Sequence, residues 1–111
     1  SPAMQASIVE AWAQSESYAL SIYHTASKML AGGSIGSESS LGKIFWSELD
    51  HMMHQTALKI LGASAELSLD SKHDAAKWIK GFMFSYAGPI YAGTNEIQKN
   101  IIAERLLGLP K

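Results

Sequence analysis

The chain has 111 residues, enough for one domain with a modest core, and 47% of them are hydrophobic while 17% are charged, which excludes a disordered chain. A net charge of −1 gives no basic surface for nucleic acid or anionic lipid. Without cysteine there is no disulfide framework, zinc–thiolate site or thiol nucleophile. No apolar run approaches the roughly 20 residues of a membrane span, and no export signal is visible. We therefore expect a soluble cytoplasmic domain with neither a nucleic-acid nor a membrane partner.

Glycine and proline residues divide the chain into four segments with helical apolar spacing. The segments cover about residues 3–30, 37–61, 74–87 and 95–107. No stretch alternates with period two for long enough to predict a strand. Four helices with short connections favour antiparallel neighbours. The sequence thus predicts a single all-α domain over residues 1–111, an antiparallel up-down-up-down four-helix bundle.

The first segment has its apolar residues on one helical stripe, at spacings of three and four. Such a stripe is typical of a helix that packs one face into a core. The stripe consists of Ile8, Trp12, Ala19, Ile22, Tyr23, Ala26, Met29 and Leu30. His24 lies near this stripe, so we expect it to be partly buried and hydrogen-bonded.

A Glu-x-x-His pair, Glu48 and His51 with His54 one turn later, is the first candidate for chemistry. In di-metal bundles, two such pairs and two further glutamates converge on the metals. This chain has one helical pair, because Asp70-x-x-His73 lies in or near a loop. The alternative is a polar face, since Lys43, Asp50 and Lys59 flank the pair on the side that we expect to be solvated. We expect no metal site.

A glycine followed by two capping residues, Gly93-Thr94-Asn95, opens the last predicted helix. The first amides of a helix lack intrahelical acceptors, and glycine lets another group approach the backbone closely. Thr94 or Asn95 can cap the helix or donate to a ligand oxygen, so a phosphate or pyrophosphate site is one interpretation. The alternative is simply a turn with its N-cap. Trp46 lies beside the apolar stripe of its own segment, and we expect it to cover a neighbouring subunit or domain.

The stretch over residues 90–110, IYAGTNEIQKNIIAERLLGLP, closely resembles the end of acyl-CoA dehydrogenases, especially the bacterial type. KIFWSEL at residues 43–49 is also similar to that family, as are Glu10-Ala11-Trp12 and Glu16-Ser17. The resemblance spans nearly the whole chain. It implies the C-terminal helical domain of an FAD-dependent enzyme, without that domain's first helix.

Several residue roles follow from the resemblance. Such enzymes oxidise an acyl-CoA thioester to the trans-2-enoyl-CoA, and a glutamate base often precedes the Gly-Thr pair. Here Ala92 occupies that position and cannot accept a proton, so no catalytic residue is assigned. The resemblance places Gly93 at the substrate. It places Thr94, Asn95 and Glu96 at FAD, and Gly62 at the FAD of a neighbouring subunit.

Two hypotheses from different classes remain. The first is a C-terminal portion of an acyl-CoA dehydrogenase, inactive as this chain alone, from a parent protein that is a homo-oligomer. The second is a stand-alone helical interaction module, or a degenerate non-catalytic subunit that has kept the motif. A bundle that lacks one packing helix is expected to expose an apolar face and to self-associate.

Overall fold

The computed structural model describes residues 1–66 and 74–111, and these residues are helical with no strand among them. The α-helices are α1 (Pro2–Leu30), α2 (Glu38–Leu61), α3 (Asp74–Ser85) and α4 (Asn95–Ile101). A 3₁₀ segment, η1 (Gly62–Glu66), follows α2, and a π-helical segment, η2 (Ile102–Leu106), continues α4. The predicted helical segments are confirmed to within two residues at each end. In the described part of the chain, no helix has both the length and the apolar character to cross a membrane.

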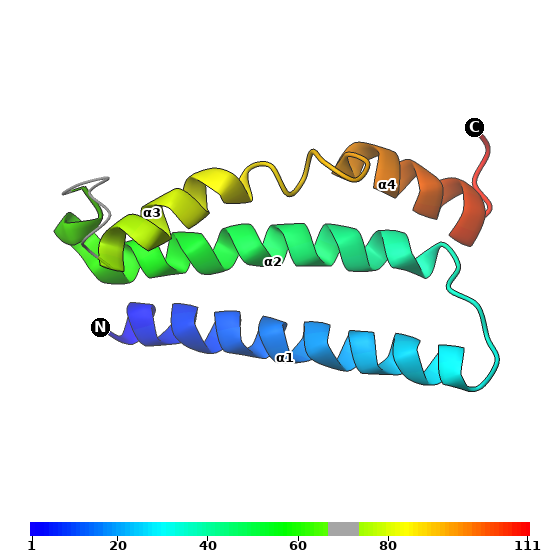
Figure 1. Ribbon diagram of the computed structural model, residues 1–111, viewed down its shortest axis with the longest axis horizontal. Helices are drawn as coiled ribbons and strands as arrows, with labels where there is room; N and C mark the ends of the chain where they lie inside the picture. The colour runs from blue at the N-terminus through cyan, green and yellow to red at the C-terminus, as the bar shows by residue number, and fades with distance from the viewer. Residues whose placement is uncertain (67–73) are drawn as a thin grey trace.

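The helices lie side by side as three rods with α2 in the middle (Figure 1). Helix α1 runs antiparallel to α2 on one side of it, while α3 and α4 follow one another along its other side. No Cα atom of α1 lies within 8 Å of α3 or α4. The predicted up-down-up-down arrangement is therefore not confirmed, because the chain does not reverse between α3 and α4.

The lengths of the helices explain this departure. The 24 residues of α2 extend about 36 Å at 1.5 Å per residue, whereas the 12 residues of α3 extend about 18 Å. Two short helices in series therefore match one long helix. The connection between them is built from tight turns that keep its direction: Ala87 N–H donates to Phe84 O at 2.9 Å, and Ile90 N–H donates to Ala87 O at 2.9 Å.

Small side chains form the contact surface of α2. Ser40, Ser47 and Thr56 of this helix are buried, and Ala75 and Ala76 of α3 are buried as well. Small residues let helix backbones approach closely. Every buried polar side-chain atom in the described residues also has a hydrogen-bond partner. Among the large apolar side chains described, Leu49 at 6% exposure is the buried one.

The apolar stripe of α1 faces solvent, contrary to the packing that its spacing predicts. Trp12 is 65% exposed and Tyr23 is 69% exposed. His24, which we expected to be partly buried, is exposed too. Tyr18 is a side chain of α1 that does pack on α2, and its ring meets Phe45 edge-on with centroids 5.6 Å apart. The backbone of α1 approaches α2 and no other described helix to within 8 Å, so Trp12 and Tyr23 are left uncovered by the described residues.

The overall dimensions agree with this open arrangement. The radius of gyration is 17.2 Å, against about 13 Å for a compact domain of this length. An exposed ion pair, Lys28 Nζ to Glu38 Oε1 at 2.8 Å, closes the α1–α2 hairpin. The hydrogen bond from Lys28 lowers the pKa of Glu38 below its ordinary value of 4.5. Exposed pairs of this kind contribute little to stability, so the hairpin depends mainly on the α1–α2 packing.

Because Leu49 is the large apolar side chain that the fold buries, its truncation tests the packing around α2. We expect Leu49→Ala to lower the free energy of unfolding by about 2–3 kcal/mol, measured by urea denaturation followed by circular dichroism. Leu20→Ala is the matched control, because Leu20 is 66% exposed; its effect should stay within about 0.5 kcal/mol. Equal effects of the two variants would contradict the described core.

Candidate functional site

The candidate site is the loop at residues 86–94, which leads from α3 into α4. The first residue of α4 closes the second half of this loop, because Asn95 N–H donates to Pro89 O at 2.9 Å. Gln98 reaches back from α4, and its Nε2 donates to Ala92 O at 3.0 Å. The Tyr91 ring lies against Trp46 of α2, with ring centroids 5.8 Å apart. Trp46 thus packs on this loop within the chain, instead of serving only as an outward-facing contact.

Two consecutive residues of this loop have left-handed backbone conformations. Ala92 has a φ of 55° and Gly93 a φ of 82°. Glycine takes this conformation at little cost, whereas alanine takes it with strain of roughly 1 kcal/mol or more. A Cβ atom at Gly93 would stand 2.7 Å from Gln98 Nε2. Gly93 is exposed, and the space on its Cβ side is closed by Gln98.

Thr94 and Glu96 flank the start of α4. Thr94 is the N-cap, and its Oγ1 accepts from Ile97 N–H at 3.3 Å, as the sequence predicts for a capping residue. This bond uses a lone pair of the hydroxyl and not its proton, so the hydroxyl can still donate to a ligand. Glu96 is exposed. Both residues therefore have polar groups that a ligand could reach.

Asn95 differs from its neighbours because its side chain is turned into the fold. It is 5% exposed, and its Oδ1 accepts from Lys43 Nζ at 2.8 Å. Its Nδ2 donates to Ser47 Oγ at 3.0 Å. The sequence analysis missed this contact and placed Lys43 on the solvated side of α2. Lys43 and Ser47 are four residues apart and hence on one helix face, which is the one signal in the sequence that could have linked them.

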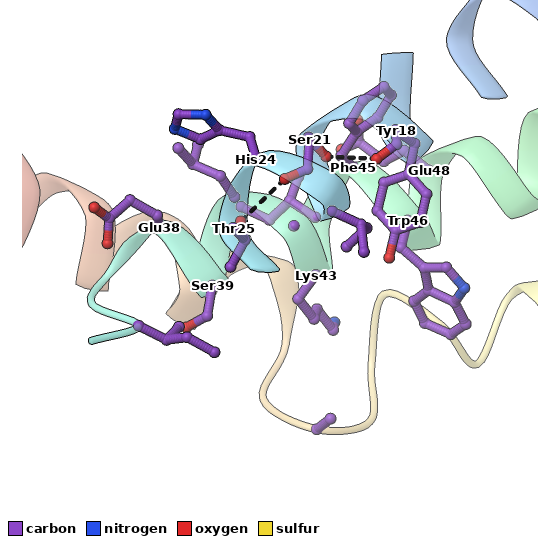
Figure 2. A pocket seen from close by; sticks show the side chains of 16 residues that line it. Tyr18, Ser21, His24, Thr25, Glu38, Ser39, Lys43, Phe45, Trp46 and Glu48 are labelled. Atoms are coloured by element: carbon purple, nitrogen blue, oxygen red, sulfur yellow. Dashed lines mark hydrogen bonds between the residues drawn. The ribbon is translucent and has the colours of Figure 1, made fainter. Parts of the chain in front are cut away.

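A groove of about 940 Å³ lies between α1 and α2 and reaches the candidate loop at Ala92. Tyr18, Ser21 and His24 line it from α1, and Glu48 lines it from α2 (Figure 2). Lys43 and Trp46 point from α2 toward the loop (Figure 2). The groove is mainly apolar, with Lys43 as the cation at the end next to the loop. Such a groove can hold an apolar group whose polar end lies near Lys43.

Gly62 lies far from this loop. It ends α2 with a φ of 56°, whereas Ser47, which contacts Asn95, lies 15 residues earlier. At 1.5 Å per residue, that separation is about 22 Å along the helix. Figure 1 shows the same separation, with η1 and α4 at opposite ends of the molecule. Within one chain, the structure therefore does not bring Gly62 to Gly93, Thr94 and Glu96.

The Glu-x-x-His residues have separate surroundings. Glu48 lines the groove toward α1, whereas His51 Nδ1 lies 2.8 Å from Ser85 Oγ of α3. His54 Nδ1 lies 2.8 Å from Asp50 O of its own helix. In the described residues, no three His, Cys, Asp or Glu side chains gather as a metal site would require. Asp70 and His73 lie outside the described residues.

Comparison with known proteins identifies the family. Residues 1–107 match the family described as acyl-CoA dehydrogenase, C-terminal domain. The chain therefore belongs to the acyl-CoA dehydrogenase C-terminal domain family, as the motif predicts.

Two curated relatives are each 35% identical to the chain over 74 residues, or 67% of its length. Both are named acyl-CoA dehydrogenase IpdE1, one from Mycobacterium tuberculosis and the other from Mycolicibacterium smegmatis. The aligned part is 19% of the first relative and 18% of the second, so the chain spans about a fifth of their length. No solved structure gives a significant match.

The left-handed loop can be tested with glycine substitutions. We expect Gly93→Ala to lower the free energy of unfolding by about 1–2 kcal/mol, because a Cβ is strained at this φ and displaces Gln98. Gly42→Ala, within α2, should instead stabilise the chain by about 0.5–1 kcal/mol, because nothing lies within 4 Å of its new Cβ. Urea denaturation measures both changes, and a stabilising Gly93→Ala would contradict the described loop.

Proposed function

We propose that this chain is the C-terminal portion of an FAD-dependent acyl-CoA dehydrogenase, which oxidises acyl-CoA thioesters at the α and β carbons. The observation that carries the proposal is the family match over residues 1–107. The chain spans about a fifth of its curated relatives, so the other parts of the catalytic site belong to other segments of the parent protein. The chain alone is then inactive.

The described residues fit a place at the edge of a cofactor and substrate site. Gly93 is exposed to solvent, which supports the assignment of substrate contact to it. Thr94 has a hydroxyl proton to donate, and Glu96 has an exposed carboxylate to accept with. Together with Gly62, these are the residues that we assign to direct contact with FAD, whereas Asn95, whose side chain is turned into the fold, belongs to the same site from behind. When bound, FAD supplies the hydride acceptor of the reaction.

Gly62 would meet a second FAD molecule, because it lies at the other end of α2 from Thr94. Residues at opposite ends of a helix about 36 Å long cannot both contact the same small region of one cofactor. This separation supports an assembly of several subunits, in which Gly62 contacts the FAD of a neighbour. We therefore propose a cytoplasmic homo-oligomer as the parent protein.

The exposed apolar face of α1 supports the proposal that another segment of the parent protein packs against it. The described helices make three rods, and a further helix from the parent would supply a fourth rod that this chain's own four helices do not form. Trp12 and Ile8 of α1 are exposed, and a helix packed against this face would bury them. A large exposed apolar patch marks an interaction surface.

Ala92 favours a second candidate, a degenerate subunit that supports an active partner. Its methyl group accepts no proton, so a chain with no other base would be inactive even when complete. In an active parent, the base comes from a carboxylate elsewhere in the protein. Activity of the complete protein in the absence of any other subunit separates the two candidates.

The proposal is tested with the product of the complete reading frame that contains this chain. We expect that product to purify with stoichiometric FAD and to reduce an electron acceptor when an acyl-CoA is added. The 111-residue chain, purified in parallel, should be colourless. A complete product that neither binds flavin nor oxidises acyl-CoA would contradict the proposal, and stoichiometric flavin on the short chain would contradict its incompleteness. Activity that appears only with a second subunit would favour the degenerate-subunit candidate.

A further inference from the structure

We infer that Lys43 and Ser47 of α2 position the Ala92–Thr94 loop by clamping Asn95, and that Asn95 serves as a positioning residue without touching the ligand through its side chain. The expected effect on FAD binding rests on the proposed function. The hydrogen-bonded contact itself is a feature of the fold and does not depend on that function. We call Lys43, Ser47 and Asn95 the α2–α4 clamp.

The hydrogen bonds of the clamp have a consistent polarity. Lys43 has only donors, so the oxygen that lies 2.8 Å from its Nζ is the Asn95 Oδ1. This orientation directs Asn95 Nδ2 to Ser47 Oγ, at 3.0 Å. The Ser47 hydroxyl can then donate to Ile44 O, also at 3.0 Å. Every donor in this series of hydrogen bonds meets an acceptor, and this pairing fixes the orientation of the Asn95 amide.

Burial makes the clamp strong. Ser47 is fully buried at 0% exposure, and Asn95 is 5% exposed. Water competes poorly at such a place, and the bond from Lys43 is charge-assisted. The Asn95 side chain is engaged at both its oxygen and its nitrogen, and its low exposure leaves a ligand little surface to contact. That is why we assign it a positioning role.

The clamp acts on the loop through the backbone of Asn95. Its N–H donates to Pro89 O, so the residue that the clamp fixes also closes the loop. Ala92 lies inside this closed segment with a φ of 55°, a conformation that a non-glycine residue keeps only when its surroundings hold it. Gly93 and Thr94 complete the segment and precede Asn95 directly. Release of Asn95 should therefore free the part of the loop that is proposed to meet substrate and FAD.

Four single variants in the product of the complete reading frame test this inference. Asn95→Leu removes both side-chain bonds of Asn95, and Lys43→Met removes the charged donor. The matched controls are Asn100→Leu, an exposed asparagine on the same helix, and Lys99→Met, an exposed lysine. Hydrogen exchange of the backbone amides at residues 90–95 reports the loop. The dissociation constant of FAD reports the site.

We expect both clamp variants to speed exchange in the loop and to weaken FAD binding by about tenfold, while both controls leave the two quantities unchanged. Asn95→Asp keeps an oxygen for Lys43, so it should fall between the wild type and Asn95→Leu. Adding Lys43→Met to it should remove that partial rescue. If Asn95→Leu fails to fold, Asn95→Asp and Lys43→Met carry the test.

A clamp variant that lowers thermal stability but leaves loop exchange and FAD affinity at the control values would overturn the inference, because Asn95 would then be merely structural. FAD affinity that falls without any change in loop exchange would also overturn it, since Asn95 would then touch the ligand itself. A wild-type product without flavin contradicts the proposed function instead. In that case, loop exchange in the variants still decides whether the clamp exists.

Discussion

Helix α2 is the element against which α1, α3 and α4 all pack, and the rest of the described structure depends on this shared contact. The small buried side chains at Ser40, Ser47 and Thr56 let its neighbours approach closely. No Cα atom of α1 lies within 8 Å of α3 or α4, so the closest backbone packing between the described helices is with α2. The arrangement of the described helices therefore depends on α2, and so does the loop before α4.

The helices themselves could be predicted from the sequence, because glycine and proline mark their ends and apolar residues recur with helical spacing. The topology could not. Spacing shows which face of a helix is apolar, but it does not show whether that face has a partner within the chain. The stripe containing Ile8 and Trp12 is apolar as predicted, yet it faces solvent. A short α3 and α4 in series along α2 also depend on the turns around Ala87, which local patterns do not reveal.

The candidate site shows the same division. The cap at Thr94 follows from local sequence, and the run over residues 90–110, with the similar segments upstream, pointed to the family that the comparison shows. The contact between Lys43 and Asn95 joins residues 52 positions apart, so no local pattern predicts it. Lys43 looked like a solvated residue because the face of α2 that meets α4 is polar. Polarity here reflects a buried hydrogen-bond network, since Ser47 and Asn95 are both buried.

The central proposal is that this chain is part of a larger protein, whose other segments cover the apolar face of α1. Hydroxyl-radical footprinting of Trp12, 65% exposed in this structure, tests that claim directly when the 111-residue chain at low concentration is compared with the complete reading-frame product. We predict that Trp12 reacts readily in the short chain and is strongly protected in the complete product. Equal reactivity in the two would contradict the claim, because the face of α1 would then remain open in the whole protein.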